Sequence, residues 1–215
     1  MRLYYRICKT LCELFICGSY RVRAYGSECV PTEGGALLLS NHQSFFDPIA
    51  VGLAINRECH YMARDSLFEI PLLGRLFASL NAFPVRRDTA DISAMKEAIR
   101  RLRAGAILCV FPEATRTPDG GIHPIKGGAI ALAQRAKVPI VPTVIEGLFE
   151  IWPRTKKFPG FGRRIGVLYG LPVDSESIRD RDPDDVAGEL TLTLRRLHNQ
   201  LRANMGRPPL HYPSE

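Results

Sequence analysis

The chain has 215 residues, of which 46% are hydrophobic, and a formal net charge of +7. That length suffices for one domain with a full hydrophobic core, and that apolar fraction excludes global disorder. The charge leaves three classes of partner open: nucleic acid, an anionic membrane surface, or a phosphorylated substrate.

The chain opens with an amphipathic helical segment, which we assign to residues 1–25. Arg2, Arg6, Lys9 and Glu13 form one narrow stripe, and apolar residues cover most of the remainder. Such a wide apolar arc suits a helix lying in a bilayer interface, and equally a terminal helix packed on its own domain. No run approaches the roughly 20 apolar residues of a transmembrane helix.

Strand and helix patterns alternate through the rest of the chain. In chain order they predict strands at 22–25, 36–40, 60–64, 83–87, 106–111, 138–145 and 165–169, and helices up to about 55 and at 66–80, 91–103, 127–136 and 184–204. We expect a break near Pro71 in the 66–80 helix and a strand broken by prolines at 138–145. The alternation predicts a single α/β domain, residues 26–205, with a mixed, largely parallel sheet flanked by helices. A loose, Pro-rich tail is expected at 206–215.

The junction between the apolar run 36–40 and the following helix holds a histidine and an aspartate. His42 and Asp47 are separated by five positions, and residues five apart within one helix lie about 140° apart around its axis. They can meet if His42 lies in the turn and Asp47 in the first helical turn, with Ser40 or Asn41 as N-cap. Spacing alone leaves two interpretations open: a general-base pair, and a capped helix with an incidental histidine.

Basic residues follow three other predicted strands, at the edge where such sheets bind ligands. Arg86 and Arg87 follow one strand, Arg116 follows another, and Lys126 stands at a glycine-rich helix start. Guanidinium groups and a helix N-terminus are suited to a phosphate. Each arginine taken singly is also compatible with a solvated surface charge.

Four segments together resemble the motifs of the PlsC-type glycerolipid acyltransferases, the 1-acylglycerol-3-phosphate acyltransferase family. The segment His42-Gln43-Ser44-Phe45-Phe46-Asp47, preceded by Asn41, is similar to the first motif. Residues 83–86, 111–117 and 138–142 are similar to the second, third and fourth motifs, in the family's order. The third motif departs from the family at Ala114, which replaces glycine, and at Thr117, which replaces serine and keeps the hydroxyl. Alanine adds a Cβ that a tight backbone disfavours.

The resemblance implies a reaction and a set of site residues. An acyl thioester, on coenzyme A or acyl carrier protein, would give its acyl group to the free hydroxyl of 1-acyl-glycerol-3-phosphate (lysophosphatidic acid), forming phosphatidic acid in phospholipid biosynthesis. His42 would be the general base and Asp47 its orienting carboxylate. The residues expected at the acceptor's phosphate end are Arg86, chosen over Arg87 from the motif register, Glu113, Arg116 and Lys126. Supporting positions are Asn41, Thr115 and Pro142.

The chemistry expected needs no cofactor, because a thioester is already activated and an imidazole can take the hydroxyl proton. Glu113 is the least natural phosphate neighbour, since a carboxylate repels a phosphate, so we expect it to fix Arg116 or to accept from a glycerol hydroxyl. Ser44 is interpreted as a structural residue, because no Gly-x-Ser-x-Gly elbow surrounds it. No Cys/His set has zinc spacing, so no metal is expected.

Amphiphilic substrates favour the membrane interpretation of the N-terminal helix. We therefore predict a peripheral protein on the cytoplasmic face of the cell membrane, with the phospholipid surface, lysophosphatidic acid and the acyl donor as partners and no nucleic acid. The alternatives are transfer to another lysolipid, a non-catalytic lipid-binding homologue, a metal-assisted hydrolase using His42, Asp47 and Glu113, and a nucleic-acid module.

Overall fold

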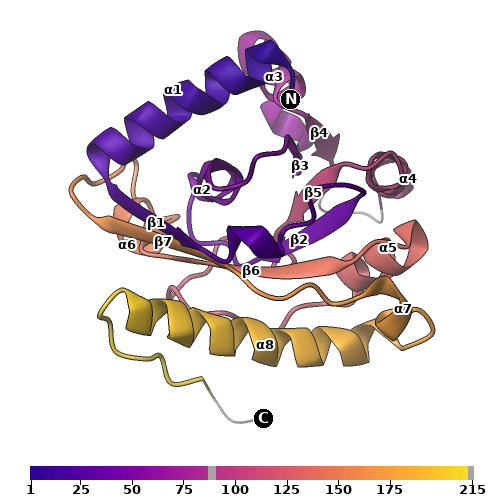
Figure 1. Cartoon of the computed structure of the whole chain (residues 1–215). Coiled ribbons are helices and arrows are strands. Elements are labelled where there is room, and N and C mark those ends of the chain that lie inside the picture. The colour runs from indigo at the N-terminus through magenta and orange to yellow at the C-terminus, as the bar shows by residue number, and fades with distance from the viewer. Residues whose placement is uncertain (87–90, 213–215) are drawn as a thin grey trace.

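A seven-stranded sheet lies between two layers of helices in the computed structural model, which describes residues 1–86 and 91–212 (Figure 1). The strand order is β1-β7-β6-β2-β5-β3-β4, and every neighbouring pair is parallel except β6 and β7. The strands are β1 (Arg21–Tyr25), β2 (Ala36–Ser40), β3 (Cys59–Arg64), β4 (Ala82–Val85), β5 (Ile107–Val110), β6 (Ile140–Glu146) and β7 (Arg164–Tyr169). The predicted mixed, largely parallel α/β fold is confirmed.

The helices divide between the two faces of the sheet, as Figure 1 shows, with α1 and α2 on one face and α8 on the other. The helices are α1 (Leu3–Ser19), α2 (Asp47–Leu53), α3 (Pro71–Ser79), α4 (Ile92–Arg103), α5 (Gly128–Ala136), α6 (Leu148–Ile151), α7 (Ser175–Ile178) and α8 (Pro183–Asn204). One core cluster joins α4, α5 and α8 to the sheet, and a second joins α1 and α2 to its other face.

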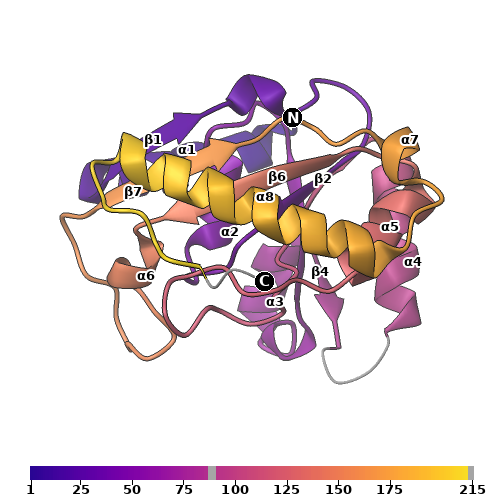
Figure 2. The same ribbon diagram turned by 90° about the horizontal axis from the view of Figure 1, so that it is seen from below.

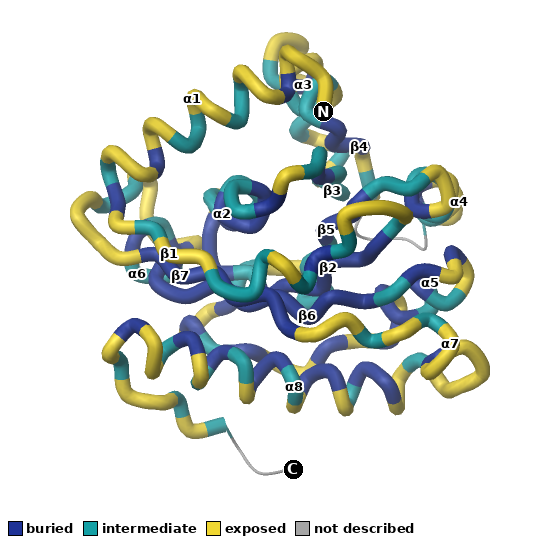
Figure 3. The backbone as a smooth tube through the Cα atoms, in the orientation of Figure 1, coloured by how far each residue is buried: buried dark blue, intermediate teal, exposed yellow. Residues whose placement is uncertain are grey.

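Strand β2 shows why the sheet is covered on both sides. Its residues Leu37 and Leu39 belong to the core under α8, whereas Ala36 and Leu38 belong to the core under α2. Successive strand side chains point to opposite faces, so an uninterrupted apolar run is expected only where both faces are buried. In Figure 3 the central strands β2 and β6 are buried along their length, whereas the edge strand β1 is largely exposed.

Two element boundaries differ from the sequence prediction. The helix expected at 66–80 begins only at Pro71, preceded by a 3-10 turn at Asp65–Leu67, because proline is favoured at the first helical position. Strand β6 is not broken at Pro142, which pairs in register with Leu39. Its carbonyl accepts a hydrogen bond from the N–H of Gly170 at 2.7 Å, so the strand continues although proline supplies no donor.

The C-terminal segment is packed, and the prediction of a loose tail is wrong for residues 206–212. Arg207 forms ion pairs with Glu146 and Glu150, and the Tyr212 hydroxyl lies 2.6 Å from Nδ1 of His198. A buried carboxylate such as Glu146 requires charged partners, and the tail supplies one of them. At the other end of the chain, residues 21–25 form β1 of the sheet. The predicted amphipathic helical segment 1–25 therefore includes the first strand.

Helix α1 turns its apolar side outward and part of its polar stripe toward the domain. Arg2 forms an ion pair with Glu58 at 3.0 Å, and the Lys9 ammonium binds the carbonyl of Ile55. Only Tyr5 and Ile16 are buried along this helix. Its other large apolar side chains are at least half exposed, for example Leu11 at 61% and Leu14 at 67%. Figure 3 shows exposed segments along much of α1.

Candidate active site

The turn between β2 and α2 brings the predicted pair together. Nδ1 of His42 lies 2.6 Å from Oδ2 of Asp47. His42 lies in the turn and Asp47 begins α2, which is the arrangement that spacing required. The expected N-caps are wrong: Ser40 ends β2, and Asn41 bonds to β6, with Nδ2 donating to the Ile145 carbonyl and Oδ1 accepting from its N–H.

The hydrogen bonds of Asp47 assign the tautomer of His42. Oδ2 of Asp47 also accepts from the backbone N–H groups of Gln43 and Ser44, at 2.5 and 2.7 Å. An oxygen that accepts two backbone bonds is not itself a hydroxyl donor, so Nδ1 of His42 must carry the proton it shares. The lone pair of Nε2 is therefore available as a base. Complete burial raises the pKa of Asp47, against the lowering effect of these hydrogen bonds.

The loop after β5 closes over the same turn. Oε1 of Glu113 accepts from the His42 N–H at 3.0 Å, and the Thr117 N–H donates to the His42 carbonyl at 2.7 Å. The Phe111 ring stacks on the imidazole, with centroids 4.3 Å apart. Backbone and ring of His42 are thus both held by the segment 111–117, which the sequence placed at the same edge of the sheet.

Glu113 has a pKa of about 7, well above its ordinary value. Burial is the main cause, and the nearby charges of Asp47 and Asp119 add to it, while hydrogen bonds from backbone N–H groups act in the opposite direction. A carboxyl group with this pKa is substantially protonated at neutral pH. Protonation would weaken the repulsion between Glu113 and a phosphate. That repulsion made Glu113 the least natural of the residues expected beside the phosphate.

The exposed Phe45 and the partly buried Arg116 lie together at the rim of the site. The Arg116 guanidinium lies 3.7 Å from the centroid of the Phe45 ring, a cation–π contact that orients the side chain. Next to it, Oγ1 of Thr115 accepts from Arg154 at 3.4 Å. Ala114 adopts φ = +57°, the left-handed conformation that favours glycine, which explains the glycine of the family pattern.

The other two predicted phosphate-binding cations, Arg86 and Lys126, follow or precede other elements and make different contacts. The backbone N–H of Arg86 donates to Asp91 at 3.0 Å, and its Nε lies 3.7 Å from the same carboxylate, with the side chain 67% exposed. Residue Arg87 lies outside the described residues. Lys126 is exposed, next to Gly127, whose N–H donates to Asp184 of α8.

Ser44 and Pro142 have structural surroundings. Ser44 is fully buried, and its hydroxyl accepts from the Phe46 N–H at 3.3 Å, in agreement with its interpretation as a structural residue. Pro142 lies within β6 rather than at the rim of the site.

Sequence reasoning missed a buried charge network behind the site. Glu146, at the end of β6, is held by His198, Arg202 and Arg207. The Gln43 side chain connects this network to the turn between β2 and α2: its Nε2 donates to the Gly120 carbonyl at 3.1 Å and lies 3.5 Å from Glu146. One signal was present in the sequence, because His198 falls on the apolar stripe of the 184–204 helix and a buried histidine needs a partner.

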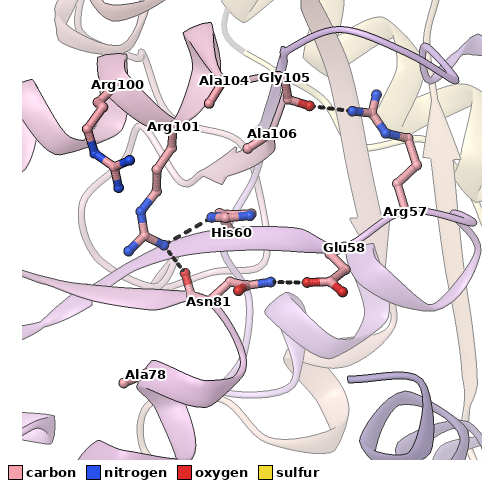
Figure 4. A pocket seen from close by; sticks show the side chains of 10 residues that line it. All are labelled: Arg57, Glu58, His60, Ala78, Asn81, Arg100, Arg101, Ala104, Gly105 and Ala106. Atoms are coloured by element: carbon pink, nitrogen blue, oxygen red, sulfur yellow. Dashed lines mark hydrogen bonds between the residues drawn. The ribbon is translucent and has the colours of Figure 1, made fainter. Parts of the chain in front are cut away.

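A larger pocket lies at the opposite edge of the sheet, where β3, β4 and β5 begin (Figure 4). It measures about 420 Å³, against about 110 Å³ for a hollow beside Gln43. Arg101 donates to His60 Nδ1 at 3.0 Å and to the Asn81 carbonyl at 2.7 Å. Burial, and then the charge of Arg101, lower the pKa of His60 to about 4, so this histidine is neutral at pH 7. None of the four motif segments lines this pocket.

Comparison with known proteins agrees with the fold. The family described as Acyltransferase matches residues 21–146. The chain therefore belongs to this family of acyltransferases. It is 32% identical over 144 residues to 1-acyl-sn-glycerol-3-phosphate acyltransferase of Bacillus subtilis (strain 168), covering 66% of this chain and 71% of that protein.

Two further relatives extend the comparison. The chloroplastic 1-acyl-sn-glycerol-3-phosphate acyltransferase BAT2 of Brassica napus is 28% identical over 155 residues, which is 71% of this chain but only 45% of the relative. The crystal structure of PlsC, the 1-acyl-sn-glycerophosphate acyltransferase from Thermotoga maritima, superposes with a TM-score of 0.77. At 23% identity, over 93% of this chain and 80% of that one, it supports the fold. The predicted family membership is confirmed.

Proposed function

We propose that the protein transfers a fatty acyl group from an acyl thioester to the free hydroxyl of 1-acyl-glycerol-3-phosphate, giving phosphatidic acid. The observation that carries the proposal is the 2.6 Å contact between His42 and Asp47 in an acyltransferase fold. The acyl group arrives on coenzyme A or on acyl carrier protein, and the reaction needs no metal or other cofactor.

The proposed chemistry starts at Nε2 of His42. This atom takes the proton of the acceptor hydroxyl as the oxygen attacks the thioester carbon, and Asp47 stabilises the imidazolium that forms. The tetrahedral intermediate collapses with cleavage of the carbon–sulfur bond. The imidazolium then returns the proton to the leaving thiolate, so His42 ends the cycle as it began.

The acceptor's phosphate would bind at the rim beside His42. Arg116 contacts the turn between β2 and α2 through the Phe45 ring. Arg86 and Lys126 would complete the site from their own strand and helix ends. Protonated Glu113 could sit beside a phosphate or donate to a glycerol oxygen, because its pKa is about 7.

We further propose that the protein works at the cytoplasmic face of the cell membrane. None of the described helices is long and apolar enough to cross a bilayer. Helix α1 instead presents an outward row of apolar side chains while Arg2 and Lys9 bind the domain. Such a surface favours a helix lying in the interface, where the acceptor and product reside.

The decisive experiment is an acceptor panel with one labelled acyl thioester. Purified protein in detergent is expected to acylate lysophosphatidic acid faster than lysophospholipids with larger headgroups, glycerol 3-phosphate or ornithine-type lysolipids. Donors on coenzyme A and on acyl carrier protein are tested in parallel. Preference for another acceptor would move the proposal to that lysolipid, and no transfer to any acceptor would support a non-catalytic lipid-binding role.

Deleting residues 1–20 is a poor test of membrane binding, because Ile16 and Tyr20 belong to the core. A surface variant is cleaner: replacing Leu3, Ile7, Leu11 and Leu14 with serine removes exposed apolar area and leaves the buried side chains in place. This variant is expected to remain folded and to stop sedimenting with phospholipid vesicles. Unchanged sedimentation would contradict the assignment of α1 as the anchor.

A further inference from the structure

The loop between α6 and β7 has a composition that the chemistry of His42 does not explain. Residues 153–164, which are this loop and the first residue of β7, contain five basic residues and no acidic one: Arg154, Lys156, Lys157, Arg163 and Arg164. Of these, Arg163 is paired with Glu150 of α6. The same loop exposes two aromatic side chains, Phe158 at 72% and Phe161 at 69%. Basic residues beside exposed aromatic rings are typical of segments that bind the interface of an anionic bilayer.

The loop is fixed to the C-terminal end of α1. The Tyr20 hydroxyl donates to the Gly160 carbonyl at 2.8 Å, and the Gly162 N–H donates to the Ser19 carbonyl at 3.3 Å. The Phe161 ring stacks on Tyr20, with an interplanar angle of 4°. The loop therefore packs against the C-terminal end of α1.

Aromatic contacts also connect the base of the loop to the catalytic turn. The Trp152 ring lies 5.0 Å from both Phe45 and Phe46, and Phe46 in turn contacts Phe15 of α1. Figure 2 shows α6 and the following loop extending beyond the sheet on the side toward which β4 points. Because β2 is parallel to β5, β5 to β3 and β3 to β4, this is also the side on which His42 follows β2.

We propose that residues 153–164 form a second membrane contact, which binds anionic phospholipid. Phe158 and Phe161 enter the interface, and the basic side chains, including Lys156 and Lys157, bind lipid phosphates. With α1, the loop makes a two-point contact that turns the His42 edge toward the bilayer that holds the acceptor. The proposal rests on the proposed membrane function. It adds that residues 153–164 set the orientation of the protein on the bilayer and its preference for anionic lipid.

The test compares binding of the full chain to vesicles of phosphatidylglycerol and of phosphatidylcholine by sedimentation. The double variant F158S/F161S is expected to lose about tenfold or more of its affinity for phosphatidylglycerol vesicles. Replacing Lys156 and Lys157 with alanine is expected to cost about fivefold per charge at low salt and to remove the preference for the anionic lipid. The matched control L171S/L192S, which removes two exposed apolar residues outside α1 and the loop, is expected to bind as the wild type does.

Trp152 offers a direct readout, since it is the only tryptophan in the chain. Its fluorescence is expected to change on addition of vesicles and to be quenched by brominated lipid, more weakly in F158S/F161S. Transfer to lysophosphatidic acid in detergent should be unchanged in that variant, which separates this proposal from the acyltransferase proposal. Wild-type vesicle affinity in F158S/F161S overturns the membrane contact. If F158S/F161S binds vesicles normally but no longer accepts acyl groups from acyl carrier protein, the loop binds that acidic protein instead. This result would also overturn the membrane contact.

Discussion

Nε2 of His198 lies 2.7 Å from Oε2 of Glu146 in the interior, and neither side chain is more than 4% exposed. Arg202 and Arg207 bind the other carboxylate oxygen. The pair joins α8 and the C-terminal segment to the end of β6, and Gln43 extends the connection to the catalytic turn. A structural network of this kind makes the site depend on residues far from it in sequence.

Glu146→Gln is expected to lower the free energy of unfolding at pH 7 by about 3 kcal/mol, because it leaves the partly buried Arg202 and Arg207 without their carboxylate. Burial would raise the pKa of Glu146, but the hydrogen bond and charge of His198 and the two arginines lower it to about 2. The carboxylate therefore stabilises the fold fully above about pH 4.5, and this contribution is lost as the pH falls toward 2.

Denaturant unfolding between pH 7 and pH 3 measures both effects, and the difference between variant and wild type should shrink toward low pH. Glu189→Gln, which removes an exposed carboxylate of α8 paired with Arg181, is the control and should change stability little. Equal losses in the two variants would contradict the role of the network.

His42→Ala is expected to abolish acyl transfer while the protein remains folded. Loss of a general base typically costs about 10²–10⁴ in rate, and the structural loss is confined to the contacts with Phe111 and Asp47. Transfer of a labelled acyl group and the unfolding free energy are measured on the same preparations. His123→Ala, at an exposed histidine of the 111–127 segment, should retain activity. Full activity in His42→Ala would contradict the role of His42 as the general base.

Glu113→Gln is expected to change the pH dependence of stability. The folded-state pKa of Glu113, about 7, lies above its ordinary value of 4.5, so the folded state binds the proton more tightly. Wild-type stability therefore decreases as the pH rises from about 4.5 through 7. The amide keeps an acceptor for the His42 N–H, and the variant should gain about 3 kcal/mol relative to the wild type between pH 4 and pH 8. Parallel stability curves for the two proteins would show that Glu113 is not buried in this way.

Ala114→Gly is expected to stabilise the protein by about 0.5–1 kcal/mol. Alanine at φ = +57° is strained, by about 1–2 kcal/mol, and the greater freedom of glycine in the unfolded chain offsets part of the gain. Thermal unfolding measures the change. Ala131→Gly, within helix α5, is the matched control and should destabilise by up to about 1 kcal/mol. The same sign in both variants would contradict the conformational argument.

Arg116→Ala is expected to reduce discrimination between lysophosphatidic acid and monoacylglycerol by about 10- to 100-fold, because a charge-assisted phosphate contact is lost. The measurement is kcat/KM for both acceptors in wild type and variant. Arg86→Ala is compared in the same way, since the exposed Arg86 is bound to Asp91. An unchanged ratio in Arg116→Ala would remove this residue from the phosphate site.

The fold class and the family could be predicted from local patterns in the sequence, and the spacing of His42 and Asp47 allowed their contact. The apolar run of β2 indicates burial on both faces, and the five-residue step lets the histidine lie in the turn and the aspartate begin the helix. The three-dimensional structure was needed to show which side chains meet across long sequence distances: Glu113 at the His42 backbone, and His198 at Glu146. It also showed that α1 turns apolar residues outward and that residues 206–212 are packed. Those outcomes depend on how buried charges find partners and on which faces the sheet leaves uncovered, and no local pattern specifies either.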